Sequence, residues 1–357
     1  MTATSRMPRI SHTSTSTPRS LAMEMRPRKA PRVPPRIPAI MTNSACSILE
    51  AASITAPTRD GYGRLLQVFL LEEGLANLDM HSHKLDELLV ARFDLLFLEG
   101  RHSSAGQKLL ASVLFWYPIQ SGRGKPKLPR AVRALKGWGR QCPAKTRTPL
   151  PFFLVCALAM QMLTMRHPVM ALYWIMMTDT YLRPSECLRM KCSQVIPPQP
   201  GRGMARVAII INPGYALQPS KTGELDESLH ITRPWVARLI LQHHRCRLRA
   251  GYQHLWPFDL GAVRKVFMAA VQALGVGHLS PVLYSARHSG ASTDRLEDRL
   301  TLLEVQRRGR WRCDSSVRRY EKRAIIQQAA ASLPRAMKAQ CLRDMEKLPA
   351  ALARALQ

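Results

Sequence analysis

Apolar side chains recur at helical spacing through residues 58–142. The clearest face consists of residues three and four positions apart, namely Leu85, Leu88, Leu89, Phe93, Leu96 and Phe97. This spacing is typical of a helix with one buried side. Similar faces consist of Leu65, Val68 and Phe69, of Leu109, Leu110, Val113 and Leu114, and of Val132, Leu135 and Trp138. We therefore predict a domain of four short helices over residues 58–142.

The second half of the chain mixes long apolar runs with a short strand pair. Uncharged residues run from 150 to 165, and a second apolar run covers 169–177. Pro168 separates the two runs, which predicts two buried helices. Residues 205–211 and 229–231 are rich in branched apolar side chains and flank a turn, a pattern typical of strands. The predicted fold class is mainly α with a small antiparallel β-hairpin or sheet.

Composition marks the boundaries of these regions. Residues 1–48 form a tail whose first forty positions hold eight Lys or Arg, seven Pro and one acid, Glu24. Such a segment lacks the apolar residues for a core, so we expect disorder there. Residues 143–150 are polar, basic and proline-containing, as linkers are. A larger domain then covers 151–335, and residues 336–357 form a C-terminal helix.

The charge balance narrows the choice of partner. The 357 residues include 53 Lys or Arg against 24 Asp or Glu, a formal net charge of +29. This excess disfavours an ordinary metabolic enzyme and fits nucleic acid or an anionic membrane surface, with a merely solvated basic surface as the alternative. Residues 26–36 fit a nuclear import signal or a DNA-gripping arm, while the acid-poor start equally fits an organellar transit peptide or a solvated tail. We expect an intracellular protein of the nucleus or nucleoid, with organellar targeting as the alternative.

Other classes of protein are disfavoured by the sequence. No run reaches 18 uncharged apolar residues, so we expect no membrane span and no membrane partner. The eight cysteines are scattered without a CxxC pair, as in an intracellular protein with reduced thiols. His81 and His83, and likewise His243, His244 and Cys246, have no second ligand pair at zinc-site spacing. We therefore expect neither a metal site nor a cofactor.

Three short segments, at residues 180–190, 284–290 and 309–320, combine arginines with His, Trp and Tyr. In the first segment Glu186 follows Arg183 by three residues, and in the second segment Arg287 and His288 are adjacent. These segments resemble motifs of the tyrosine recombinases, the phage-integrase family. Arg183 and Glu186 match an arginine and the acid three residues after it in that family's first box, and Arg287 and His288 match the last two positions of its HxxRH box.

The third segment matches the end of the same pattern. Trp311 stands nine residues before Tyr320, the family's spacing between a His or Trp and the nucleophilic tyrosine. The family's catalytic lysine lies on a β-hairpin between the two arginine boxes, and Lys221 occupies the matching place. The resemblance covers residues 150 to 325 and implies a mixed α+β catalytic domain. By pattern alone, residues 58–142 resemble the family's helical, SAM-like core-binding domain, which binds DNA.

The resemblance implies a role for each matching residue. Tyr320 would be the nucleophile and Lys221 the general acid that protonates the leaving oxygen. Arg183 and Arg287 would bind the scissile phosphate, because an arginine stays charged and presents a planar fork of donors. His288 would assist proton movement or orient the phosphate.

Two further residues would support these groups. Trp311 would pack against the phosphate site and donate its indole N–H, and Glu186 would orient Arg183 or His288. The sequence departs from the family at Tyr284, where a His is usual, and at Arg310, where Gly commonly precedes the His or Trp. A phenol is a poor base at neutral pH, so the first departure implies slow turnover.

Each assignment has a structural alternative. Arg183 and Glu186 fit an ion pair at a helix start, Lys221 an ordinary hairpin lysine, and Tyr320 a core tyrosine. The function implied is that of a site-specific recombinase or integrase, of the kind mobile elements use, that cleaves and rejoins DNA through a 3′-phosphotyrosyl intermediate. The alternatives are DNA relaxation like that of a type IB topoisomerase, and a catalytically inactive DNA-binding derivative.

The expected partner is double-stranded DNA, with the protein assembled as a homo-tetramer on paired sites. Strong, salt-dependent binding to phosphates is expected from basic side chains on the last helix predicted within residues 58–142 and in the third motif segment. These side chains are Arg130, Arg133, Lys136, Arg140, Arg307, Arg308, Arg310 and Arg312. Residues 336–357 are a candidate segment for docking on a neighbouring protomer.

Overall fold

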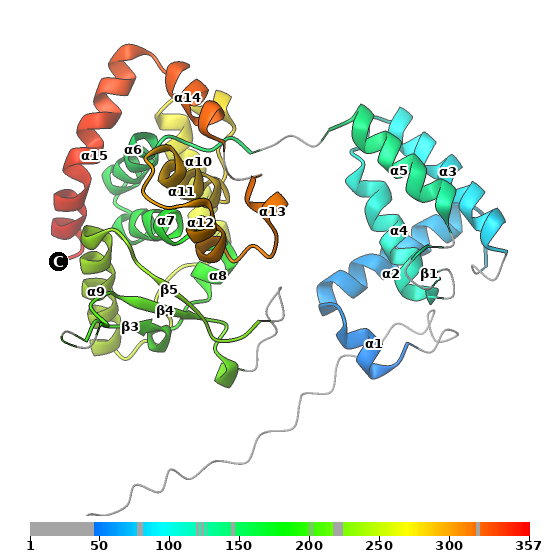
Figure 1. Ribbon diagram of the computed structural model, residues 1–357, viewed down its shortest axis with the longest axis horizontal. Helices are drawn as coiled ribbons and strands as arrows, with labels where there is room; N and C mark the ends of the chain where they lie inside the picture. The colour runs from blue at the N-terminus through cyan, green and yellow to red at the C-terminus, as the bar shows by residue number, and fades with distance from the viewer. Residues whose placement is uncertain are drawn as a thin grey trace, which may run out of the picture. The chain divides into compact units, whose positions relative to one another are not determined.

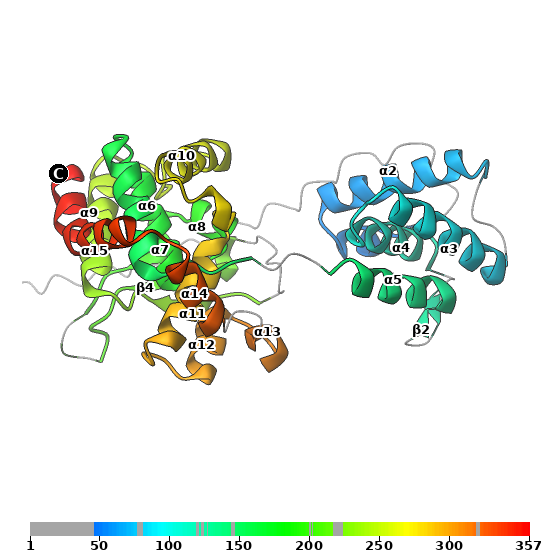
Figure 2. The same cartoon turned by 90° about the horizontal axis from the view of Figure 1, so that it is seen from above.

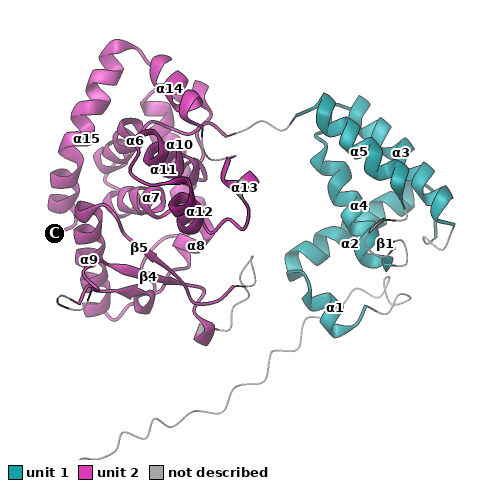
Figure 3. Cartoon of the chain, viewed as in Figure 1, with its two compact units in different colours: residues 1–144 teal, residues 145–357 magenta. Residues whose placement is uncertain are grey.

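The computed structural model divides the chain into two compact units, residues 1–144 (unit 1) and residues 145–357 (unit 2) (Figure 3). The residues that it describes are 46–76, 81–118, 121–122, 125–126, 128–143, 147–199, 201, 203–216, 224–318 and 322–357. Most of the predicted tail, residues 1–45, therefore lies outside the described residues. The boundary between the units falls inside the segment expected to be a linker.

Unit 1 is built from helices and one short strand pair. Its elements are α1 (Ile48–Ala52), α2 (Ala56–Glu72), α3 (Ser82–Leu98), α4 (Ser104–Trp116), β1 (Ser121–Gly122), β2 (Lys125–Pro126) and α5 (Pro129–Gln141). The buried carboxylate of Asp86 accepts hydrogen bonds from the backbone N–H groups of Arg130 at 2.9 Å and Ala131 at 2.7 Å. These contacts satisfy two free donors at the start of α5, so α3 fixes where α5 begins.

The predicted apolar faces of unit 1 are only partly right. Of the face predicted on α3, Leu85, Leu89 and Phe93 are buried, whereas Phe97 is exposed. On α2 the predicted Phe69 is buried, but Leu65 and Val68 are exposed and Leu66 is buried in their place. On α5 the buried side chains are Ala131, Leu135 and Trp138, while Val132 is exposed. On α2 and α5 the buried face is therefore shifted around the helix axis from the face that the spacing predicted.

Unit 2 places its helices around an apolar centre (Figure 1). Its helices are α6 (Phe152–Thr164), α7 (Pro168–Thr180), α8 (Pro184–Leu188), α9 (Pro234–Arg249), α10 (Leu260–Ala273), α11 (Ser285–Leu296), α12 (Leu302–Gly309), α13 (Asp314–Arg318), α14 (Arg323–Ala331) and α15 (Arg335–Ala355). Every side chain of α7 from Ala171 to Thr180 is buried, so the two helices predicted on either side of Pro168 form the middle of the unit. Figure 2 shows α6 and α7 enclosed by the other helices.

A three-stranded antiparallel sheet completes unit 2. Strands β3 (Val195–Ile196), β4 (Ala208–Ile211) and β5 (Glu227–His230) lie in that order. Strands β4 and β5 are the predicted pair, whereas β3 was not foreseen. The prediction of a mainly helical fold with a small antiparallel sheet is confirmed.

Helix α15 lies along α6 of its own chain (Figure 1). Its apolar residues Cys341, Leu348 and Leu352 are buried in the core of unit 2. This apolar face of α15 covers the chain's own core, and docking of residues 336–357 on a neighbouring protomer stays a prediction. Among the residues described, no helix combines the length and apolar character that crossing a membrane requires.

Candidate functional site

The first motif segment follows directly from the end of α7. Tyr181 adopts a left-handed conformation with φ of 53°, which ends α7, and Pro184 then starts α8. The carboxylate of Glu186 accepts a hydrogen bond from the backbone N–H of Arg183 at 3.0 Å and pairs with its guanidinium. Glu186 therefore pairs with Arg183 at the start of α8, a contact that fits both the orienting role and the structural ion pair predicted for these two residues.

Glu186 also holds an arginine of the third segment. Arg310 donates to its carboxylate at 2.6 Å and to that of Glu227 on β5 at 3.3 Å. Burial opposes ionisation of Glu186, but Arg310 and then Arg183 lower its pKa below the ordinary value. Glu186 thus stays charged between two guanidinium groups.

Arg287 is the point where the three segments meet. Its side chain is 0% exposed and donates hydrogen bonds to the backbone carbonyls of Tyr181 and Gly309. Its guanidinium carbon lies 4.6 Å from the centroid of the Trp311 ring. A phosphate therefore reaches this guanidinium only when the chain around it moves.

Tyr284 and His288 lie beside Arg183 and Arg287. The ring centroids of Tyr284 and His288 are 5.7 Å apart, and Tyr284 also contacts Arg183. Burial opposes a charge on Arg183, but Glu186 and Tyr284 outweigh it and raise the pKa of that guanidinium. The structure therefore places Arg183, Tyr284, Arg287 and His288 together, with Trp311 stacked on Arg287.

His288 is neutral at physiological pH. Its burial, and then the positive charges of Lys322, Arg147 and Arg287, lower its pKa from 6.5 to about 3. An imidazole of this pKa is a weak base, so its chemistry here is to donate or accept a hydrogen bond. This property favours the orienting role predicted for His288 over a role as general base.

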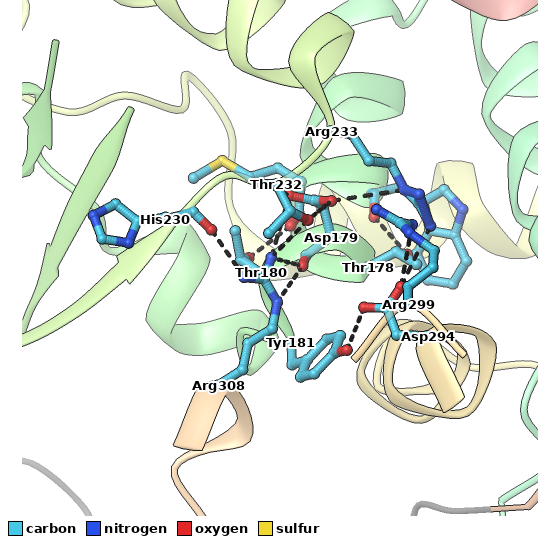
Figure 4. A network of polar contacts seen from close by, with 12 residues as sticks. Thr178, Asp179, Thr180, Tyr181, His230, Thr232, Arg233, Asp294, Arg299 and Arg308 are labelled. Carbon is cyan, nitrogen blue, oxygen red and sulfur yellow. Dashed lines mark hydrogen bonds and ion pairs between the residues drawn. The ribbon is translucent and has the colours of Figure 1, made fainter. Parts of the chain in front are cut away.

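A buried polar network joins the end of α7 to α11 and α12 next to the candidate site (Figure 4). The carboxylate of Asp179 on α7 accepts hydrogen bonds from the backbone N–H and the hydroxyl of Thr232, both at 2.9 Å, and pairs with Arg308 and Arg233. The hydroxyl of Tyr181 donates to Asp294 of α11. Burial, and then Asp294, raise the pKa of Tyr181 well above the ordinary value, so this phenol stays protonated. The network thereby holds the two chain segments, at Tyr181 and at Gly309, whose carbonyls accept hydrogen bonds from Arg287.

Two arginines predicted to bind DNA belong to this interior instead. The side chain of Arg308 is 9% exposed and donates to the carbonyls of Asp179 and His230. That of Arg310 is 6% exposed and is held by Glu186 and Glu227. Apart from Nε of Arg310, which is buried without a partner among the described residues, the donors of these guanidinium groups bond to the protein, so the predicted contact with DNA is corrected for both residues.

The other predicted DNA contacts lie on the surface. Arg307 and Arg312 are exposed, and Arg312 forms an ion pair with Glu224 at 3.5 Å. On α5 the four predicted basic residues are all exposed, namely Arg130, Arg133, Lys136 and Arg140. Arg130 pairs with Glu87 of α3 at 2.9 Å. Contact with DNA stays a prediction for these residues.

Two predicted site residues lie outside the described residues: Lys221, the candidate general acid, and Tyr320, the candidate nucleophile. Sequence reasoning also missed two residues beside the site, Arg147 and Lys322. Arg147 belongs to the segment that composition marked as a linker, and Lys322 to the basic run after Arg307. Within the part of the chain that the structure describes, no three His, Cys, Asp or Glu side chains are grouped as a metal site requires.

The fold of the chain is of the tyrosine-recombinase type. It is similar to the solved structure of the XerH site-specific recombinase bound to a palindromic difH substrate, in a post-cleavage complex, with a TM-score of 0.52 and 14% identity. The similarity covers 75% of this chain and 78% of XerH. The solved structure of the XerA recombinase matches over 80% of this chain and 95% of its own, with 13% identity and a TM-score of 0.37. No protein-family model and no curated protein sequence matches the chain.

Proposed function

We propose that the protein is a site-specific DNA recombinase that cleaves and rejoins DNA through a 3′-phosphotyrosyl intermediate on Tyr320. The observation that carries the proposal is the meeting of three distant segments in one cationic site. Arg183, Arg287 and the pair Tyr284–His288 lie together there, with Trp311 over Arg287. The fold that the chain shares with XerH, solved on its DNA substrate, supports the same function.

The chemistry suits a phosphodiester. The phenol of Tyr320 gives its proton to solvent and its oxygen bonds to phosphorus, while the bond from phosphorus to the 5′ oxygen breaks. Charge that develops on the nonbridging oxygens is stabilised by Arg183 and Arg287, and positioned donors of this kind are worth about 3–4 kcal/mol each. Lys221 supplies the proton that the 5′ oxygen needs. The phosphotyrosyl bond conserves the energy of the broken bond, so rejoining runs the same step backwards.

The basic composition supports DNA as the substrate. A net charge of +29 attracts a polyanion, and the exposed cations of α5 offer contacts to phosphates. Recombination joins two duplexes, so we propose a tetramer on paired sites. Such a protein acts where DNA is held, in a nucleus, a nucleoid or a DNA-containing organelle.

A second candidate is a DNA-binding protein that has lost the cleavage activity. The complete burial of Arg287, and its hydrogen bonds to two backbone carbonyls, favour this alternative. It shares the DNA partner and the fold with the first candidate. It differs in forming no covalent adduct.

A covalent-trapping experiment decides between the two candidates. Nicked duplexes of randomised sequence release a short 5′-hydroxyl fragment after cleavage and leave the protein attached to DNA. The wild-type protein is expected to give adducts that resist SDS, and sequencing the captured DNA then reveals the site. Tyr320→Phe is expected to give no adduct at unchanged DNA affinity. An adduct that persists in this variant refutes the nucleophile, and binding without any wild-type adduct favours the inactive candidate.

A further inference from the structure

Two basic residues that match no position of the family's motifs, Arg147 and Lys322, lie at the candidate site. Arg147 precedes α6, and its guanidinium carbon lies 4.3 Å from the centroid of the Tyr284 ring. Lys322 precedes α14, and its ammonium group donates a hydrogen bond to the backbone carbonyl of Arg147 at 3.0 Å. Two segments 175 residues apart are thereby joined beside Tyr284 and His288.

The guanidinium carbon of Arg147 lies over the Tyr284 ring, and Arg147 is exposed while Tyr284 is half-buried. A guanidinium over the face of a ring can keep its N–H bonds directed outward, away from the ring. This position therefore puts the donors of Arg147 at the solvent-facing edge of the site. The arrangement suits an incoming anion with several acceptor oxygens.

The positive charge of the site also favours the binding of an anion. Arg147, Lys322 and Arg287 all act electrostatically on His288, and Arg183 contacts the adjacent Tyr284. Glu186, the acid nearest to these groups in the first motif, is already held by Arg183 and Arg310. Cations brought this close repel one another, and a bound anion relieves that repulsion.

We propose that Arg147 and Lys322 form, with Arg183 and the hydroxyl of Tyr284, the outer part of a binding site for a phosphate group. In the free protein this outer part binds a phosphate anion. In the recombinase proposed above it binds a phosphodiester of DNA, and this identity of the ligand rests on the proposed function. Arg147 follows the boundary between the two units, so the chain that joins them contributes a ligand-binding side chain.

The test uses the full-length protein and inorganic phosphate, with isotope-labelled histidine observed by NMR. In the wild type, phosphate is expected to raise the pKa of His288 because the anion offsets the surrounding cations. Arg147→Ala is expected to raise the pKa of His288 without phosphate and to weaken phosphate binding about tenfold, the effect of one lost charge-assisted hydrogen bond. Lys322→Met is expected to behave in the same way.

Arg249→Ala is the matched control, because Arg249 is an exposed arginine at the end of α9 in the same unit. It is expected to change neither phosphate affinity nor His288. Phosphate affinity that Arg147→Ala leaves unchanged overturns the proposal, and so does an equal loss in the control, which means an adventitious effect of surface charge.

The covalent-trapping assay separates this proposal from the proposed function. Where the wild type forms an adduct, Arg147→Ala is expected to slow its formation about tenfold, with a smaller change in DNA affinity. A wild type that forms no adduct but binds phosphate through Arg147 refutes cleavage and supports the site. An adduct rate that Arg147→Ala leaves unchanged refutes the site and leaves cleavage standing.

Discussion

Neutralising Asp179 tests whether the buried network stabilises unit 2. Its side chain is 2% exposed and faces Arg308 at 3.4 Å and Arg233 at 3.6 Å, besides its two hydrogen bonds from Thr232. Asp179→Asn keeps the shape but removes the charge, and its amide N–H groups face other donors. Both guanidinium groups then remain buried without their common counter-charge.

The expected cost follows from these contacts. Breaking a buried ion pair by removing one partner destabilises a protein by about 3–5 kcal/mol. Since the substituted amide would retain one acceptor oxygen for Thr232, we expect the free energy of unfolding of unit 2 to fall by about 3 kcal/mol. For a unit of this size that loss lowers the melting temperature by about 6–12 °C.

Urea unfolding of the full-length protein, followed by tryptophan fluorescence and fitted with separate transitions for the two units, measures this change. Asp298→Asn is the matched control. Asp298 pairs with Arg323 at 3.2 Å, but its side chain is 75% exposed, so the expected change is within about 1 kcal/mol. If Asp179→Asn costs no more than the control, the network does not stabilise the unit and this reasoning is wrong.

Two more predictions concern α11. Gly290→Ala adds a Cβ that would lie 2.0 Å from the backbone oxygen of Thr178, so we expect the free energy of unfolding to fall by about 3 kcal/mol. Gly137→Ala, which has open space around it on α5, is expected instead to stabilise unit 1 slightly; equal effects in urea unfolding contradict the packing argument. For His288, the folded-state pKa of about 3 lies below the ordinary 6.5, so the unfolded chain binds the proton first. Stability from this group is complete above pH 6.5 and is lost as the pH falls toward 3, by up to about 1.4 kcal/mol per pH unit. Unfolding curves measured across this range should show a smaller loss for His288→Gln, and parallel losses refute the assignment.

The sequence predicted helices better than it predicted which side of each helix is buried. On α3 the predicted Leu85, Leu89 and Phe93 are buried, but Phe97 of the same predicted face is exposed. Apolar residues stand next to one another on both helices, as at Leu88 and Leu89 of α3 and at Leu65 and Leu66 of α2. Helical spacing alone admits two neighbouring faces there, and packing against the other helices selects between them.

The motifs predicted which segments meet at the candidate site, but the charges around it were misjudged where partners are distant in sequence. Arg308 and Arg310 belong to a basic run, which predicts a surface that contacts phosphates. Their acidic partners, Asp179, Glu186 and Glu227, come from segments that only the fold brings near. Arg147 was overlooked for the opposite reason, because its surroundings have the composition of a linker.

The residue that ends α7 meets two requirements that oppose each other. The left-handed backbone at Tyr181 suits glycine and costs a larger residue about 1 kcal/mol or more. Yet the ring of Tyr181 is fully buried, stacks on Trp311 and occupies the space left by the missing side chain of Gly290. Glycine here would relax the main chain but leave a void beside Gly290, while any comparable ring would fill the space and retain the strain. A small residue at position 181 is therefore expected to be accompanied by a larger one at position 290, so the two positions are coupled.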